Sequence, residues 1–266
     1  MLALDVGNTH LRLALFRDGE IIARDRLRTN ALGEGEPAAG ELARLLSRLA
    51  SGAGGREAWI ASVVPAAEPA LEKILAQAGF AARFIRSGQD RILPHALASP
   101  ESTGVDRLLA ALAAGARHFA GPAEREGYAV VQCGSAATVD IVDRDGVFRG
   151  GHILPGPEMW LSGLARAARI PDYAGERPDW ENRSLGNNTR DAARRGLAAG
   201  LPEAVAASLR LLMAEAGIGR GEGPPPAALT GGWGGAVARL VPGCRLDQDL
   251  LLHGVRIFAL KTRPNA

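Results

Sequence analysis

Two turns, each a glycine followed by small polar residues, are the part of this sequence best suited to bind an anion. Residues 7–9 read Gly-Asn-Thr, and residues 134–136 read Gly-Ser-Ala. Glycine permits a tight turn, and the backbone N–H groups that such a turn exposes bind anions, phosphate above all. Two such turns facing each other would hold a polyphosphate from both sides. Each turn alone is equally compatible with an ordinary hairpin bend.

Two aspartates stand where they would serve phosphoryl transfer. Asp5 precedes the first turn, where a carboxylate would bind Mg²⁺ directly or through water, although Asp also forms turns. Asp106 lies in the first turn of a predicted helix, whose dipole helps to keep it ionised. It would accept a hydroxyl proton there, although helix starts also favour Asp for structural reasons alone. No Gly-x4-Gly-Lys-Ser/Thr motif is present, which excludes a P-loop mechanism.

An internal repeat indicates how these residues are positioned. The segment from residue 2 to 22 and the segment from residue 129 to 151 share one pattern at an offset of 127 residues: apolar run, glycine turn, apolar run, Asp-Gly turn. The same gap-free offset aligns Arg-Asp-Gly at 17–19 with Arg-Asp-Gly at 144–146. The pattern predicts a β-hairpin with its first bend at the glycine in each copy. The chain is therefore predicted to contain two copies of one half-domain.

Apolar periodicity predicts an α/β fold of two similar lobes. Each lobe would have a mixed sheet that starts with three antiparallel strands and is flanked by helices. We expect an N-terminal lobe over residues 1–119, including a helix that links the lobes, and a C-terminal lobe over residues 120–266. Beyond the repeated strands, helices are predicted at 37–50, 66–79, 104–119, 157–168, 188–216 and 250–260, and strands at 58–64, 81–85 and 227–230.

Composition favours a cytoplasmic protein with a small-molecule ligand. The 31 basic and 29 acidic residues are interspersed, which gives no basic stripe for nucleic acid. Cys133 and Cys244 lie far apart, and the five histidines have no ligand spacing, so neither a disulfide framework nor a zinc site is expected. No signal peptide or membrane anchor is predicted, and no apolar run approaches the ~18 to 20 residues that span a bilayer.

The repeat resembles the acetate and sugar kinase, Hsp70 and actin superfold, so the two lobes are expected to be actin-like. A series of motifs in a specific order and spacing is similar to the signature of type III pantothenate kinases. The motifs are Asp5-x-Gly-Asn-Thr9, Ser62-Val-Val-Pro65, Gly104-x-Asp-Arg107, Gly134-Ser-Ala136, Gly150-Gly151 with Pro155-Gly156, Gly186-Asn-Asn-Thr189 and Thr230-Gly-Gly232.

This resemblance implies ATP-dependent phosphorylation of the terminal hydroxyl of pantothenate, the first step towards coenzyme A, by a cytoplasmic homodimer. It implies Asp106 as the general base and Asp5 as the Mg²⁺ ligand. The residues implied to hold phosphates are Asp5, Gly7, Asn8, Thr9, Gly134 and Ser135, and those implied to line the pantothenate pocket are Gly104, Arg107 and Thr189.

Three positions depart from the family pattern. Gln132 stands where the family has an aspartate that helps to bind a monovalent cation, K⁺ or NH₄⁺, and a neutral amide attracts a cation less strongly. Leu97 replaces a tyrosine near the substrate, and Ala137 removes one hydroxyl from the second turn. Two alternatives therefore stay open: a kinase for another small hydroxylated substrate, and a non-catalytic paralogue that binds nucleotide or pantothenate in a regulatory role.

Overall fold

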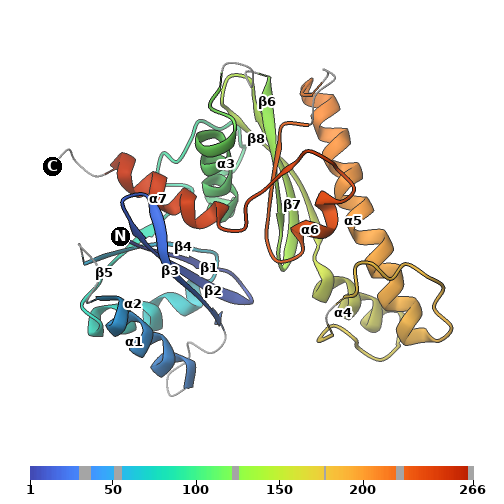
Figure 1. Cartoon of the computed structure of the whole chain (residues 1–266), viewed down its shortest axis with the longest axis horizontal. Coiled ribbons are helices and arrows are strands. Elements are labelled where there is room, and N and C mark those ends of the chain that lie inside the picture. Colours follow the sequence, from blue (N-terminus) through green and yellow to red (C-terminus); the bar gives the residue numbers. More distant parts are fainter. Residues whose placement is uncertain (30–36, 51–55, 122–125, 177, 220–224, 263–266) are drawn as a thin grey trace. The chain divides into compact units, whose positions relative to one another are not determined.

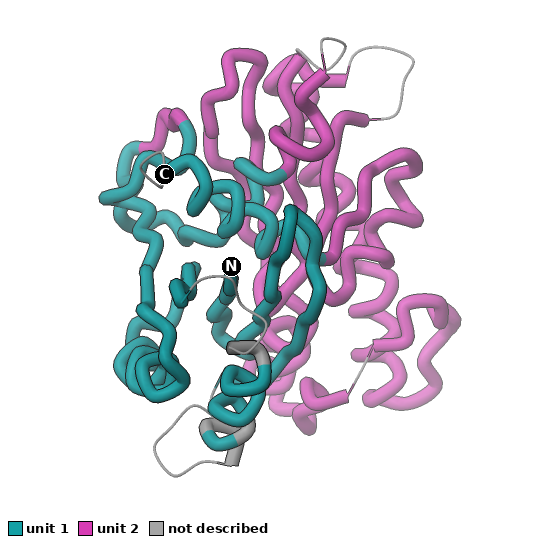
Figure 2. The backbone as a smooth tube through the Cα atoms, turned by 60° about the vertical axis from the view of Figure 1, so that its left-hand side comes forward, with its two compact units in different colours: residues 1–93, 98–113, 249–266 teal, residues 94–97, 114–248 magenta. Residues whose placement is uncertain are grey.

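The computed structural model describes all residues except 30–36, 51–55, 122–125, 177, 220–224 and 263–266. The chain forms two compact units (Figure 2). Unit 1 comprises Met1–Leu93, Ala98–Ala113 and Asp249–Ala266, and unit 2 comprises Pro94–Leu97 and Ala114–Gln248. Each unit contains one five-stranded sheet.

The sheet of unit 1 has the strand order β3-β2-β1-β4-β5 (Figure 1). Strands β1 to β3 are antiparallel, whereas β4 and β5 run parallel to β1. The β2–β3 hairpin turns at Asp18 and Gly19, which both have positive φ, as a two-residue hairpin loop requires. The strands are β1 (Leu2–Val6), β2 (His10–Arg17), β3 (Glu20–Arg28), β4 (Glu57–Ser62) and β5 (Ala81–Ile85).

Helices cover both faces of this sheet. Leu2, Leu4 and Val6 alternate along β1 and pack in a buried cluster with leucines of α1 (Pro37–Ala50) and α2 (Glu68–Gln77). The opposite face of β1 and β4 contacts α7 (Leu250–Thr262). Helix α3 (Val105–His118) approaches α7 closely at Gly254, because a Cβ there would meet the carbonyl of Leu109.

The sheet of unit 2 repeats this arrangement in the order β10-β9-β6-β7-β8. Strands β6, β7 and β8 are antiparallel, and β9 runs parallel to β6. The first three strands therefore correspond to β1, β2 and β3, as the sequence repeat predicts. Their bounds are β6 (Gly127–Cys133), β7 (Ala136–Asp143), β8 (Phe148–Pro155), β9 (Ala227–Thr230) and β10 (Arg245–Leu246).

One face of this second sheet packs against α5 (Thr189–Ala216), α4 (Pro157–Ala168) and the short α6 (Gly234–Ala238). Within the described residues, α5 is the single helix long and apolar enough, by length and composition, to cross a bilayer. Its apolar side chains pack in the core cluster of unit 2, as those of a core helix do.

The predicted α/β class and the predicted helices and strands are confirmed, with small shifts at their ends. The strand predicted at 58–64 ends at Ser62, because Pro65 opens a 3₁₀ turn, η2 (Pro65–Ala67). The elements that periodicity did not reveal are short: β10, α6, η2 and η3 (Pro100–Ser102). Grouping by contacts places residues 249–266 with unit 1, although they follow unit 2 in sequence. The lobe boundary near residue 119 stays a prediction.

Candidate functional site

The first glycine turn, residues 7–9, connects the buried β1 to β2. The N–H of Gly7 donates to the carbonyl of His10 at 3.0 Å, which closes the turn. Thr29 is buried after the end of β3 and holds the turn from the side. Its hydroxyl donates to the carbonyl of Gly7 at 2.6 Å, and its N–H donates to the carbonyl of Thr9 at 3.1 Å. Asn8 is left exposed at the tip.

Asp5 is nearly buried on β1 and pairs with Arg12, its cross-strand neighbour on β2. Both Nε and Nη2 of Arg12 donate to one oxygen of Asp5, at 2.9 and 2.7 Å. The guanidinium compensates the buried carboxylate and fixes its orientation. A cation bound by Asp5 would therefore share this carboxylate with Arg12.

The start of α3 places Asp106 beside Gly104. The Asp106 carboxylate accepts a hydrogen bond from the N–H of Arg107 at 2.9 Å, and the same N–H lies 3.1 Å from the Gly104 carbonyl. A Cβ at position 104 would collide with Oδ1 of Asp106. Glycine at 104 therefore leaves room for the Asp106 carboxylate, which a side chain at 104 would displace, and this accounts for the Gly-x-Asp-Arg spacing.

The second glycine turn, residues 134–136, is enclosed by two further glycines. Its own Gly134 N–H donates to the Ala136 carbonyl at 3.0 Å, much as Gly7 closes the first turn. Gly156 follows β8 and donates from its N–H to the Ser135 carbonyl at 3.1 Å, and a Cβ there would collide with that carbonyl. Gly231 follows β9 at φ +92°, where a Cβ would collide with the backbone of Cys133. These contacts explain the Pro-Gly and Thr-Gly-Gly motifs.

A tryptophan also supports the second turn. The indole Nε1 of Trp233 donates to the Gly134 carbonyl at 3.0 Å. Trp180 stacks on Trp233 with ring centroids 5.5 Å apart, which links the turn to the loop before α5. Burial raises the pKa of the adjacent Cys133 thiol well above its ordinary range. Because the thiol stays protonated, Cys133 acts in packing and not as a nucleophile.

Helix α5 begins at Thr189. Asn188 caps the helix by accepting from the N–H of Asp191 at 2.9 Å. Gly186 lies directly against the first helical turn, since a Cβ there would collide with the backbone N of Ala192. The Gly-Asn-Asn-Thr motif is thus a close-packed helix start that leaves Thr189 exposed.

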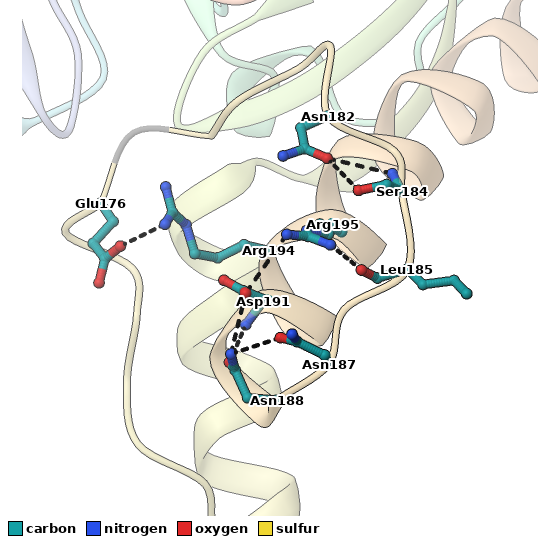
Figure 3. Close-up of polar contacts among 9 residues, drawn as sticks. All are labelled: Glu176, Asn182, Ser184, Leu185, Asn187, Asn188, Asp191, Arg194 and Arg195. Atoms are coloured by element: carbon teal, nitrogen blue, oxygen red, sulfur yellow. Dashed lines mark hydrogen bonds and ion pairs between the residues drawn. The ribbon is translucent and has the colours of Figure 1, made fainter.

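Arginines hold the preceding loop onto α5. Arg194 forms an ion pair with Glu176 at 3.0 Å, and Arg195 donates to the carbonyl of Leu185 (Figure 3). Arg190 also donates to Glu176 at 2.7 Å and lowers the pKa of that carboxyl. The Glu176 carboxylate is exposed to solvent, so this network orients the loop more than it stabilises the fold.

The predicted site residues divide between the two units. Unit 1 contains Asp5, Gly7, Asn8, Thr9, Gly104, Asp106 and Arg107, and unit 2 contains Gln132, Gly134, Ser135 and Thr189. In the described part of the chain, no three His, Cys, Asp or Glu residues cluster as a metal site. Sequence reasoning missed the supports Arg12, Thr29 and Trp233, because each contact forms only after strands have paired, and those of Thr29 and Trp233 span 22 and 99 residues. For Arg12 alone the sequence offered a signal: its charge is opposite to that of Asp5, and it lies in the adjacent predicted strand.

Comparisons of the fold place the chain in a class. A ROK family glucokinase from Streptomyces griseus, in complex with glucose and AMPPNP, matches with a TM-score of 0.53 at 13% identity, covering 98% of this chain and 99% of that one. A conserved putative Baf family transcriptional activator from Campylobacter jejuni matches with a TM-score of 0.55 at 19% identity over 98% of both chains. At these identities the likeness concerns the fold alone. The fold is that of the actin-like sugar kinases.

Sequence comparison gives the family within that class. The family model for type III pantothenate kinase matches residues 1–210. A relative named type III pantothenate kinase, from Thermomicrobium roseum, is 32% identical over 261 residues, which cover 96% of this chain and 95% of the relative. The chain belongs to the type III pantothenate kinase family.

Proposed function

We propose that this protein transfers the γ-phosphoryl group of ATP to the terminal hydroxyl of pantothenate, the first step of coenzyme A synthesis. The structural observation that carries the proposal is the room left by Gly104 for the Asp106 carboxylate at the start of α3. A carboxylate fixed at a helix N-terminus stays ionised and can accept a proton. Membership of the family supplies the substrate class.

In the proposed mechanism, Asp106 accepts the proton of the attacking hydroxyl. Phosphoryl transfer depends mainly on positioning and on charge neutralisation, because the transition state carries most of its charge on the phosphoryl oxygens. Asn8 and Thr9 of the first glycine turn and Ser135 of the second would hold phosphate oxygens, since the N–H groups of Gly7 and Gly134 already close their own turns. Gly104, Arg107 and Thr189 would line the pantothenate pocket.

Asp5 would hold Mg²⁺, which supplies neutralisation of the phosphate charge when it is bound. A single protein carboxylate fits Mg²⁺, because this ion keeps several waters and takes its other ligands from nucleotide phosphates. Arg12 donates two hydrogen bonds to Oδ2 of Asp5, and Asp5 is the residue that would hold the ion.

We also propose that the protein acts as a cytoplasmic homodimer, as the family resemblance implies. Support comes from exposed apolar side chains on adjacent elements of unit 2: Ile153 on β8 and Met159 on α4 are 64% and 49% exposed. Apolar side chains of this size that are exposed together mark association surfaces. Light scattering of the purified protein would give twice the chain mass of 27.7 kDa if the dimer forms.

The experiment that tests the proposed function is a phosphorylation assay with MgATP and a panel of acceptors: pantothenate, glucose and N-acetylmannosamine. Product would be identified by mass spectrometry. Phosphopantothenate formed in preference to sugar phosphates is the expected result. Preferential phosphorylation of a sugar would contradict the proposal and would indicate a kinase for another hydroxylated substrate. Binding of MgATP or pantothenate without turnover would instead favour the non-catalytic paralogue.

A further inference from the structure

Three polar side chains form a row across the sheet of unit 2, close to the second glycine turn. Gln132 on β6 is in register with Thr138 on β7 and with Thr230 on β9. Side chains that are paired across strands lie on the same face of a sheet. This face is opposite to the one on which Val131 and Cys133 pack in the core. Gln132 also stands only two residues before Gly134.

Two atoms of this row are buried without a hydrogen-bond partner. They are Nε2 of Gln132 and Oγ1 of Thr138, and no described residue pairs with either atom. Thr138 is 8% exposed, so solvent does not satisfy its hydroxyl. A buried donor that lacks an acceptor is unfavourable, and native structures nearly always supply one. Two such donors in register on adjacent strands indicate one missing acceptor.

The chemistry of the row does not fit a monovalent cation. The row contains an amide and two hydroxyls, whose oxygens are neutral ligands, and no carboxylate to attract a cation, and the unpaired atom of Gln132 is the donor Nε2. The nearest carboxylate on this face of β7 is Asp140, two positions further along the strand. It is completely buried and has an interaction of its own. A phosphate oxygen, in contrast, accepts from both donors.

We propose that Gln132 Nε2 and Thr138 Oγ1 together donate to a phosphate oxygen of the bound nucleotide, and that this pair replaces the K⁺ or NH₄⁺ ion of the family. The inference rests on the proposed function for the identity of the nucleotide. Gln132 and Thr138 are thus nucleotide-binding residues, and the kinase works without a monovalent cation. An ordered water in the same place would satisfy both donors but would leave nucleotide affinity independent of them.

The first test measures MgATP affinity by calorimetry and needs no turnover. Thr138→Val removes the hydroxyl and keeps the shape of the side chain, and Gln132→Met removes the amide. Each variant should bind MgATP about tenfold more weakly, because a hydrogen bond to a charged phosphate is stronger than a neutral one. Thr262→Val on α7 is the control, because Thr262 is not among the residues proposed to bind a substrate. Thr189→Val would not serve, because Thr189 is proposed to line the pantothenate pocket. Unchanged affinity in both variants would assign the pair to a water and overturn the proposal.

The second test asks whether a carboxylate at this position creates a cation site. Melting temperatures of the wild type and of Gln132→Asp are compared in potassium chloride and in tetramethylammonium chloride at equal ionic strength. Potassium should stabilise only the variant, since a ligand that binds the folded state raises its melting temperature. The exposed Gln89→Asp controls for the added charge. Stabilisation of the wild type by potassium would overturn the proposal.

Turnover of pantothenate gives a third readout. The wild type should keep its rate to within about twofold when tetramethylammonium replaces potassium, because a neutral amide has little attraction for a cation. A wild-type rate that requires potassium contradicts the inference and leaves the proposed function intact. Absence of turnover in every salt contradicts the proposed function, and the affinity and melting measurements then still decide the inference. If Gln132→Asp fails to fold, the inference is tested by the melting temperatures of the wild type in the two salts and by the MgATP affinity of Thr138→Val.

Discussion

At the scale of single residues, an ion pair holds Asp5, one of the charged residues that the family resemblance marks as functional. Asp5 would be costly to bury alone, and Arg12 on the adjacent strand compensates it at 2.7 Å. The pairing also means that stability and the proposed binding of Mg²⁺ depend on the same carboxylate. Variants at the two positions separate these roles.

Asp5→Asn should raise the Mg²⁺ concentration required for half-maximal turnover and should lower the free energy of unfolding by about 1–3 kcal/mol, the worth of a hydrogen bond to a charged group. Arg12→Gln is the matched control, because it breaks the same ion pair but keeps the carboxylate. It should lose more stability than Asp5→Asn, because the buried carboxylate stays without its counter-charge, and its turnover should still respond to Mg²⁺. An Asp5→Asn enzyme with the parental Mg²⁺ titration would remove Asp5 from the metal site.

A second ion pair gives unit 1 a pH-dependent stability. Nη1 and Nη2 of Arg86 donate to the two carboxylate oxygens of Glu68, at 2.8 and 2.6 Å. These hydrogen bonds hold the pKa of Glu68 below its ordinary value of 4.5. A carboxyl whose pKa is lower in the folded state stabilises the fold above its unfolded pKa. That stabilisation is lost as the pH falls through the folded pKa.

The wild type should therefore be more stable than Glu68→Gln at pH 7, and the difference should shrink as the pH falls below about 4.5. Urea denaturation at a series of pH values measures it. Glu72→Gln, at an exposed position of the same helix, is the control and should follow the wild type. A difference between wild type and Glu68→Gln that does not change with pH would contradict the assignment.

At the scale of elements, the second glycine turn is held by the ends of two strands and the starts of the helices that follow. Gly156 begins α4 after β8, and Gly231 follows β9 just before α6. Each passes so close to the β6–β7 connection that only glycine fits. The backbone of these two glycines, together with the indole of Trp233, therefore restricts the geometry of the turn.

Gly156→Ala should displace the second glycine turn, because its Cβ would meet the backbone carbonyl of Ser135, which cannot yield. We expect MgATP affinity to fall and stability to decrease by about 1–3 kcal/mol. Gly163→Ala in the same helix has open space around it and should stabilise the protein by about 0.5–1 kcal/mol through helix propensity. Calorimetry and denaturant titration compare the two. Equal effects would show that the contact of Gly156 is unimportant.

Trp233→Phe should raise the KM for MgATP about fivefold with little change in kcat, because it removes one hydrogen bond to the Gly134 carbonyl. Trp59→Phe is the control: its buried Nε1 has no partner among the described residues, so only ring area is lost. Steady-state kinetics would separate them. The same KM change in both variants would indicate a general loss of packing.

At the scale of the whole molecule, the sequence predicted the two sheets well because the repeat carries local information twice. The apolar runs of β1 and β6, glycine at the bends and Asp-Gly at the hairpins are all local signals. The supports of the site were not predictable in this way: Thr29 contacts Gly7, and Trp233 contacts Gly134, across 22 and 99 residues. Such contacts exist only after the strands pair. The short α6 and β10 carry no periodic signal either.

The residues assigned to the proposed reaction lie in both units: Asp106 belongs to unit 1 and Ser135 to unit 2. Asp106 is proposed only as the proton acceptor, and no contact with the nucleotide is assigned to it. A change confined to the proton acceptor should reduce turnover and leave the nucleotide site as it was.

The most direct measurement compares pantothenate phosphorylation and MgATP binding in the wild type and Asp106→Asn. Asparagine keeps the size of the side chain and an acceptor for the Arg107 N–H. Turnover should fall about 10²- to 10⁴-fold, the usual contribution of a general base, while the Kd for MgATP stays within about twofold. Asp25→Asn, at an exposed position, should behave as the wild type. Unchanged turnover in Asp106→Asn would contradict the role of Asp106 as the base.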